Sequence, residues 1–298
     1  MKLEDCYKAL EKQNEEYLTL RNSYELWLGK TIKVLFSLNL KRIYACIVSA
    51  IRSKKIKGNI IEQPIFYASG LPIDKNNKVV VYSCVTGDYD VISDPILVDD
   101  QLDYYLISDT DEKKTEWKHL DIPNEACLYH GGMVNRFCKL NPWNFFSDYD
   151  YSIYIDGNIE IVSDIRNLCS IAKNSKIGIA MHLHNRRDCI YVERNVCKLY
   201  KRGNLIAIDK QVDKYHQEGF PEHFGMVEAT IIIVDLKNKI AKKIMGEWWN
   251  ELLQSGSGRD QLSFPYILWK NGYSISDVGC LGNNRAKNPK FRTKSHCL

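Results

Sequence analysis

Residues 149–164 read YDYSIYIDGNIEIVSD, and the interpretation of the whole chain starts from this stretch. The apolar residues 151–156 predict a buried strand that ends in the acidic turn Asp156-Gly157-Asn158. Asp156 and Asn158 offer carboxylate and amide oxygens, which suit Mg²⁺ or Mn²⁺, and Gly157 permits a close approach of backbone and phosphates. As a bare tripeptide, the same residues also suit a simple hairpin turn.

The pattern around this turn favours a binding site. From residue 78 onward, short β-rich runs alternate with helical segments, which predicts an α/β domain with a largely parallel sheet. Ligands of such sheets gather beyond the carboxyl ends of the strands, which is where Asp156 falls. The expected strands are residues 79–85, 103–109, 151–156, 176–182 and 230–236, and the expected helices are residues 132–146, 164–174, 190–201, 239–255 and 260–271.

The composition is that of an ordinary globular enzyme. With 298 residues, of which 45% are apolar and 26% charged, we expect one catalytic core with an extension, and neither a disordered nor a fibrous chain. The ten cysteines contain no CxxC pair and the chain begins without a secretory signal, so we expect a reducing, cytoplasmic location. Without a GxSxG elbow or a spaced zinc triad, a hydrolase is disfavoured.

Residues 1–57 predict a helical arm. An imperfect heptad seam runs through positions 3, 7, 10, 14, 17, 21, 24 and 28, and Asn14 and Arg21 weaken it. The alternatives are a coiled coil that forms a homodimer and an amphipathic helix docked on the catalytic domain. We expect a linker at residues 58–77 and the catalytic domain at residues 78–298.

The second half of the arm, residues 24–57, interleaves apolar with basic residues. Such a segment either lies on an anionic membrane surface, which would make the protein peripheral on the inner face of the membrane, or forms a helical hairpin with a basic solvated face. Its apolar runs are shorter than the roughly 20 residues of a spanning helix. Because the basic residues form no broad face, nucleic acid is not an expected partner.

Seven segments together resemble the plant and bacterial glycosyltransferase-like family known from mucilage synthesis. They are VVVYSCVTGDYDVI (79–92), DYYLISD (103–109), NRFCKLNPWNFF (135–146), YSIYIDGNIEI (151–161), HNRRDCIYVERNVC (184–197), QVDKYHQEGFP (211–221) and RDQLSFPYILWKNG (259–272). They follow one another in the order that the family shows. This resemblance implies a GT-A fold, a Rossmann-like domain that binds a nucleotide-diphosphate sugar, of which UDP-sugars are the first choice.

The resemblance also assigns roles to the residues that follow the first strands. The family's metal-binding DxD motif reads Asp156-Gly157-Asn158 here, so an amide replaces the second carboxylate, and His296 is a candidate third ligand. The resemblance implies that two groups of residues face the nucleobase and ribose. They are Thr86, Gly87, Asp88 and Tyr89 after the first strand, and Asp109 after the second. A strand-to-loop turn is the plainer interpretation of Gly87 and Asp88.

A basic pair precedes the acidic turn. Arg136 and Lys139 are three residues apart on an expected helix and can present to one face. In a nucleotide-sugar enzyme they would hold the diphosphate, and otherwise they are solvated helix surface.

A second acidic segment, Arg259-Asp260-Gln261, opens an expected helix, where the resemblance places contacts with the donor sugar. Asp260 is a candidate general base in an inverting reaction, a ligand of donor hydroxyls in a retaining one, or only a helix cap. Glu228 is a second candidate for the acid/base or acceptor-binding role, and Glu193 is a third. The resemblance also makes His182, His184, His216 and His223 candidates for the third metal ligand, and polar active-site contacts or ordinary hydrogen-bonded histidines are their plainer interpretation.

These features lead to one expected function and one alternative. The first is a glycosyltransferase that uses Mn²⁺ or Mg²⁺ and moves a sugar to a glycan or lipid-linked acceptor in surface polysaccharide assembly, such as capsule or O-antigen. The element LGKTIKVL, residues 28–35, resembles one found beside bacterial transferases of that kind. The alternative is a non-catalytic scaffold in a polysaccharide complex, which the loss of acidic character at Asn158 favours.

Overall fold

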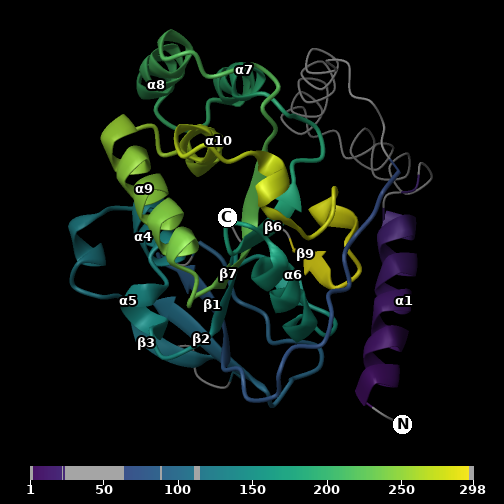
Figure 1. Cartoon of the computed structure of the whole chain (residues 1–298). Coiled ribbons are helices and arrows are strands. Elements are labelled where there is room, and N and C mark those ends of the chain that lie inside the picture. Colours follow the sequence, from purple (N-terminus) through teal and green to yellow (C-terminus); the bar gives the residue numbers. More distant parts are fainter. Residues whose placement is uncertain (1–2, 22, 24–63, 88, 111–114, 295–298) are drawn as a thin grey trace, which may run out of the picture.

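The computed structural model describes residues 3–21, 23, 64–87, 89–110 and 115–294 (Figure 1). Its centre is a seven-stranded sheet. In spatial order the strands are β3 (Lys118–Asp121), β2 (Leu102–Ser108), β1 (Val79–Val85), β4 (Tyr151–Ile155), β7 (Val227–Asp235), β6 (Ile179–Leu183) and β8 (Gly279–Cys280). All neighbouring pairs are parallel except those of β7, which runs antiparallel to both β4 and β6. The expected α/β architecture of the GT-A type, a mostly parallel sheet with a helix before it, is confirmed.

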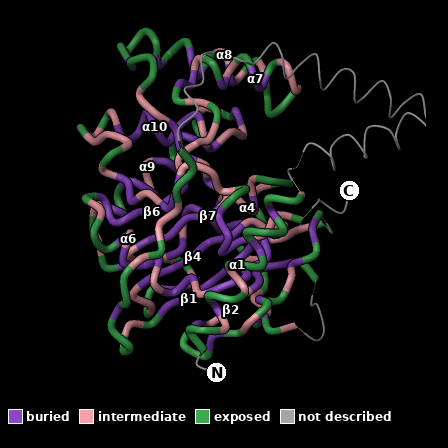
Figure 2. Tube along the Cα trace, turned by 90° about the vertical axis from the view of Figure 1, so that its right-hand side faces the viewer, coloured by how far each residue is buried: buried purple, intermediate pink, exposed green. Residues whose placement is uncertain are grey.

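Helices cover both faces of the sheet because successive side chains of each strand point to opposite faces. On β1, Val80 and Tyr82 belong to one apolar core, and Val79 and Val81 belong to another. The first core includes side chains of α4 (Gly132–Leu140), α9 (Lys239–Ser255) and α10 (Asp260–Lys270), whereas the second includes side chains of α6 (Cys169–Asn174). Figure 1 shows α4 and α9 on the other side of the strands from α6, and Figure 2 shows the strands as the buried centre.

The remaining elements lie around this frame. They are α1 (Leu3–Arg21), α5 (Trp143–Phe146), α7 (Ile190–Tyr200), α8 (Leu205–Gln217), the short 3₁₀ helices η1 (Ala126–Leu128), η2 (Arg166–Leu168), η3 (Ile275–Asp277) and η4 (Arg285–Lys287), and the strands β5 (Ile159–Ile161) and β9 (Phe291–Thr293). Strands β5 and β9 pair with each other in a separate two-stranded sheet.

The helix α1 packs against the same chain. Tyr7, Asn14 and Leu18 are buried, and Asn14 donates to backbone carbonyls of the segment that ends in β9. Two of the seam positions, Asn14 and Arg21, are therefore occupied by intramolecular hydrogen bonds. Part of the expected linker is also attached to the domain, because Tyr67 forms a β-bridge with Gly282.

Several elements differ from the sequence prediction. The expected helix at residues 132–146 is two helices, α4 and α5, because Pro142 lacks the N–H that a continuous helix needs. The expected helix at residues 164–174 begins as the 3₁₀ turn η2. Strands β3, β8 and β9 and helix α8 were not expected. In the part of the chain that the structure describes, no helix is both long and apolar enough to span a bilayer.

A substitution in the central strand tests this core. Ile153 is fully buried in β4 between β1 and β7, whereas Ile206 in α8 is 73% exposed. We expect Ile153→Ala to lower the free energy of unfolding by about 2–5 kcal/mol, because it leaves a cavity, and Ile206→Ala to change it by less than about 0.5 kcal/mol. Urea titration followed by circular dichroism measures both. Equal losses in the two variants would contradict this description of the core.

Candidate functional site

Three parallel strands end at one edge of the sheet. In the sheet register Val85 of β1 pairs with Ser108 of β2, and Tyr82 of β1 pairs with Tyr154 of β4. The residues that follow these strands therefore meet at the carboxyl edge, as predicted for α/β sheets.

The loops after β1 and β2 are tied together. The backbone N–H of Gly87 donates to both carboxylate oxygens of Asp109, at 3.2 and 3.0 Å. Gly87 has φ 64°, a left-handed conformation that suits glycine. Thr86 lies beside it, Tyr89 is half exposed, and Asp88 lies outside the described residues. Asp109 thus holds the loop that carries the predicted nucleoside contacts.

The acidic turn fits closely against β1. A Cβ atom at Gly157 would lie 2.6 Å from Cγ2 of Val85 and 3.2 Å from Cβ of Asp90. The space that glycine provides here accommodates the protein's own loop, whereas the sequence suggested an approach of phosphates. Any larger residue at position 157 would push the turn away from β1.

A buried lysine joins the acidic turn to the start of α10. The Lys139 side chain in α4 is 5% exposed, and its Nζ lies 3.0 Å from Oδ2 of Asp260 and 3.8 Å from Oδ1 of Asp156. The Asp156 side chain is 36% exposed and so remains accessible to a ligand. Three predicted site residues, distant in sequence, are brought together in this way.

Tyr154 fixes the orientation of Asp156. Its hydroxyl donates to Oδ1 of Asp156 at 2.9 Å and accepts from Nδ2 of Asn135 at 2.9 Å, and the same amide group donates to the carbonyl of Cys84. Burial, reinforced by the charge of Asp156, raises the pKa of the Tyr154 hydroxyl well above its usual value. The hydroxyl therefore stays protonated and keeps donating to the carboxylate.

Cationic neighbours keep the Asp260 carboxylate ionised. Burial alone would raise the pKa of this carboxyl, but the positive charges of Lys139, Arg136 and Arg259 outweigh burial and hold the pKa well below its usual range. A carboxylate of such low basicity is a weak proton acceptor. The helix-cap position belongs to Arg259, which makes no side-chain cap.

A fully buried carboxylate lies at the neighbouring helix α7. Glu193 is 0% exposed, with its Oε2 2.5 Å from Nε of Arg187 and its Oε1 3.2 Å from Nη2 of Arg259. Arg259 also donates to Oε1 of Gln261 at 3.0 Å. Glu193 therefore holds two guanidinium groups, which accounts for it without an acid/base role. Arg187 was missed in the sequence, although it lies in the segment 184–197.

Glu228 lies in β7, the strand that pairs with β4 next to the acidic turn. The N–H of Asp156 donates to the carbonyl of Thr230, two residues beyond Glu228 in β7. The Glu228 carboxylate pairs with Nε of Arg285 at 3.2 Å, and Arg285 also donates to Oγ1 of Thr293 in β9.

Two of the candidate histidines, His182 and His184, are shielded from water. Burial, with the charge of Arg285, lowers the pKa of His182 to about 3, and burial, with the charge of Arg187, lowers that of His184 to about 3. Both rings are neutral at pH 7. His223 pairs with Asp188, and His216 lies against the ring of Tyr191.

The residues of the turn match part of a divalent-metal site. Asp156 and Asn158 supply hard oxygen donors on both sides of Gly157. Nδ2 of Asn158 donates to the carbonyl of Lys294 at 3.3 Å, which orients the amide and brings the end of the described chain to the turn. Within the described ranges, no group of three or more His, Cys, Asp or Glu side chains could hold a metal, and the candidate ligand His296 lies outside them.

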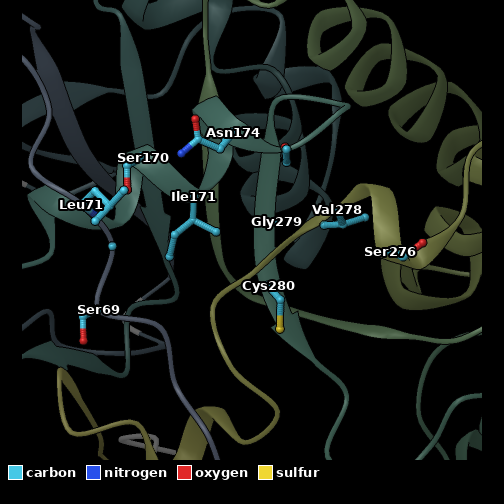
Figure 3. A pocket seen from close by; sticks show the side chains of 11 residues that line it. Ser69, Leu71, Ser170, Ile171, Asn174, Ser276, Val278, Gly279 and Cys280 are labelled. Carbon is cyan, nitrogen blue, oxygen red and sulfur yellow. The ribbon is translucent and has the colours of Figure 1, made fainter.

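A pocket of about 590 Å³ lies elsewhere, between α6, the turn η3 and the edge strand β8 (Figure 3). Its lining combines hydroxyl groups such as those of Ser170 and Ser276 with apolar side chains such as Ile171, and it includes no charged residue. Ser170 already accepts from the N–H of Leu71 and donates to the carbonyl of Asn167. This pocket does not suit an anionic donor and belongs to a different part of the sheet.

Removal of the buried ammonium tests the site electrostatics. We expect Lys139→Met to lower the free energy of unfolding by about 3–5 kcal/mol at pH 7, because two carboxylates lose their shared cation. The lowered pKa of Asp260 stabilises the fold above the ordinary aspartate pKa of about 3.9, and this contribution is lost as the pH falls below it. The difference from wild type should therefore shrink as the pH falls below about 4.

The matched control breaks an exposed pair. Lys118→Met removes the partner of Asp103, whose side chain is 42% exposed, and should change the free energy of unfolding by less than about 1 kcal/mol. Denaturant titrations at several pH values compare the variants. A loss that is the same for both lysines, or independent of pH, would contradict the buried role of Lys139.

Comparisons with known proteins found similar solved structures and a matching family. The solved structures similar to it include the galactosyltransferase LgtC in complex with donor and acceptor sugar analogs (10% identity, 66% of this chain and 71% of that chain, TM-score 0.39). Mouse xyloside xylosyltransferase 1 (9%, 68% and 83%, 0.39) and the mannosyltransferase Ktr4p from S. cerevisiae (12%, 75% and 74%, 0.35) are also similar. No sequence among curated proteins matches the chain significantly.

The sequence profile described as "TOD1/MUCI70, glycosyltransferase-like domain" matches residues 68–277, which is more than half of the chain. This is the mucilage-type family that the sequence motifs resemble, and the predicted enzyme class, a glycosyltransferase, agrees with it. The chain belongs to the TOD1/MUCI70 glycosyltransferase-like family.

Proposed function

We propose that the protein transfers a sugar from a nucleotide-diphosphate donor to a glycan or lipid-linked acceptor, with the donor diphosphate bound beside Asp156. The observation that carries the proposal is the Asp156, Lys139 and Asp260 cluster at the carboxyl edge of the sheet. Family membership supports sugar transfer in general, and the charges around this cluster support the donor class.

Cationic side chains that suit a diphosphate lie near the cluster. Arg136, Lys139 and Arg259 act on Asp260, and Arg187 and Arg259 pair with Glu193. Guanidinium groups bind phosphate oxygens in a bidentate manner, and a lysine acts as a point charge.

A divalent cation would complete the neutralisation. We propose that Asp156 and Asn158 hold Mn²⁺ or Mg²⁺ together with His296, which is two residues beyond Lys294 in the sequence. When bound, the metal would supply positive charge to the leaving diphosphate. The chain's own part is to fix the Asp156 carboxylate through Tyr154 and Lys139.

The nucleoside would lie against the loop after β1. Asp109 holds Gly87 and so positions the loop with Thr86, Asp88 and Tyr89. Tyr89 is 50% exposed, and its ring can stack on a nucleobase. Uracil is the base that we propose, by resemblance to the family.

The two catalytic candidates differ in their surroundings. The low pKa of Asp260 favours a role in fixing Lys139 and donor hydroxyls, alongside Arg259 and Gln261, over proton abstraction. Glu228 is the carboxylate that we propose for the acid/base or acceptor-binding role, because it lies in β7 two residues before Thr230, whose carbonyl accepts from the N–H of Asp156, and it pairs with Arg285.

We propose that the acceptor belongs to surface polysaccharide assembly, such as capsule or O-antigen. Transfer would take place at the cytoplasmic face of the membrane. The segment expected to contact that membrane, residues 24–57, lies outside the described residues. The contacts of α1 with its own chain favour the docked-helix alternative over the homodimer.

Substitutions in the turn test the donor site. We expect Asp156→Ala to lower the rate of donor hydrolysis or transfer by about 10²–10³-fold, because the fixed carboxylate is lost. Asn158→Asp should tighten Mn²⁺ binding on the order of tenfold, because a carboxylate replaces an amide. Product analysis across UDP-, GDP- and other nucleotide sugars measures activity, and calorimetry with Mn²⁺ measures affinity.

Asp148→Ala is the matched control, since Asp148 is exposed and precedes β4, whereas the turn follows that strand. If wild type neither binds nor turns over any nucleotide sugar, with or without metal, the non-catalytic scaffold becomes the better description.

The membrane proposal has its own test. Because α1 is part of the folded unit, charge reversal is more informative than deletion of the arm. We expect Lys54, Lys55 and Lys57→Glu together to abolish co-sedimentation with anionic vesicles, since each lysine near such a surface contributes about 1 kcal/mol. Equal sedimentation of wild type with anionic and neutral vesicles would remove the membrane from the proposal.

A further inference from the structure

The amide of Asn14, in the middle of α1, is completely buried. Its Nδ2 donates to the carbonyls of Pro289 at 2.8 Å and Phe291 at 3.1 Å, and its Oδ1 accepts from Nε of Arg292 at 3.0 Å. A buried amide is tolerated when its hydrogen bonds are made, and it then specifies one arrangement of the groups around it. Here the arrangement joins α1 to β9.

The strand β9 leads directly to the acidic turn. It pairs with β5, with Ile159 opposite Thr293 and Glu160 opposite Arg292. Beyond this pairing, the N–H of Lys294 donates to the carbonyl of Asn158 at 2.9 Å, and Nδ2 of Asn158 donates to the carbonyl of Lys294 at 3.3 Å. Asn158 is thus held on its backbone and on its side chain by the residue that follows β9.

Charged side chains make a second connection along the same path. Arg292, which bonds to Asn14 through Nε, also pairs through Nη1 with Oε2 of Glu160 at 3.1 Å. Lys294 pairs with the other oxygen of Glu160 at 2.7 Å. The Glu160 side chain is 12% exposed, so these pairs are partly shielded from solvent.

Other residues on the same face of α1 hold the same segment. Glu11 pairs with Nζ of Lys290 at 2.5 Å, and Nη1 of Arg21 donates to the carbonyl of Thr293 at 2.8 Å. Positions 11, 14, 18 and 21 recur at helical spacing and lie on one face. Polar side chains on this face of α1 therefore hold β9 in position.

We propose that Asn14 is a positioning residue for the acidic turn: through β9 it fixes Asn158, and through Asn158 the geometry of the ligand site beside Asp156. No residue of α1 is required to touch the donor. The proposal rests on the proposed function only where it names the ligand, Mn²⁺ with a nucleoside diphosphate.

Amide hydrogen exchange tests the connection without any ligand. We expect Asn14→Ala to increase exchange in residues 156–161 and 290–294 by about tenfold, because unsatisfied partners loosen β9. Gln13→Ala is the matched control, since it removes an amide from an exposed position one residue away on the same helix. Arg292→Gln breaks the connection from the strand side and should give the same increase.

The second measurement is the affinity for Mn²⁺ with UDP by calorimetry. Asn14→Ala and Arg292→Gln should weaken it about tenfold, and Gln13→Ala should leave it unchanged. Faster exchange in α1 with unchanged exchange at residues 156–161 would overturn the proposal, as would unchanged affinity in both variants. If wild type binds no nucleotide, the proposed donor is wrong, while the exchange experiment still decides the role of Asn14.

Wild type alone provides a test that does not depend on the folding of any variant. In native-state exchange with increasing denaturant, α1 and residues 156–161 should open together, with the same free energy and the same denaturant dependence. Opening of α1 at low denaturant while residues 156–161 stay protected would overturn the proposal.

Discussion

The ammonium group of Lys139 lies between two carboxylates, at a position where its side chain is 5% exposed. Asp156 reaches it from the end of β4 and Asp260 from the start of α10, so one charge connects the sheet, α4 and the last long helix. Because a buried charge is tolerated only with close partners, each of these elements must be in place before the others are stable there. The site and the fold share this constraint.

The pairing of buried charges also determines the chemistry at the carboxyl edge of the sheet. Cations around Asp260 keep it ionised and weakly basic, while Tyr154 keeps Asp156 aligned. Glu193 pairs with Arg187 and Arg259, which fixes two guanidinium groups on a carboxylate that is itself buried. The carboxylates thus act on cations, and the cations remain to act on an anionic ligand. This arrangement of paired carboxylates and cations suits phosphate binding better than general base catalysis at Asp260.

The sequence predicted the frame of the fold and named several residues that the structure places together at the carboxyl edge, for identifiable reasons. The long apolar strands and the turn at Asp156 carry strong local signals, and Arg136, Lys139 and the 259–261 segment stand in recognisable patterns. Short strands such as β8 and β9 carry no periodic signal, because they are held by their partners.

Long-range contacts explain what the sequence could not show. The sequence does not distinguish Arg187 from the basic residues beside it, because its pairing with Glu193 is seen only once the fold has buried that carboxylate. Asn14 was interpreted as a defect in a coiled-coil seam, and its actual partners lie more than 270 residues away in the sequence.

The pairing of β5 with β9 has a consequence for biosynthesis. Asp156 and the turn leave the ribosome long before residues 289–294, and the helix that holds those residues leaves first. The nascent chain can therefore build most of the sheet while its acidic turn still lacks the strand that fixes it. Completion of the site must wait for the late arrival of β9, because Lys294 holds Asn158 on its backbone and on its side chain.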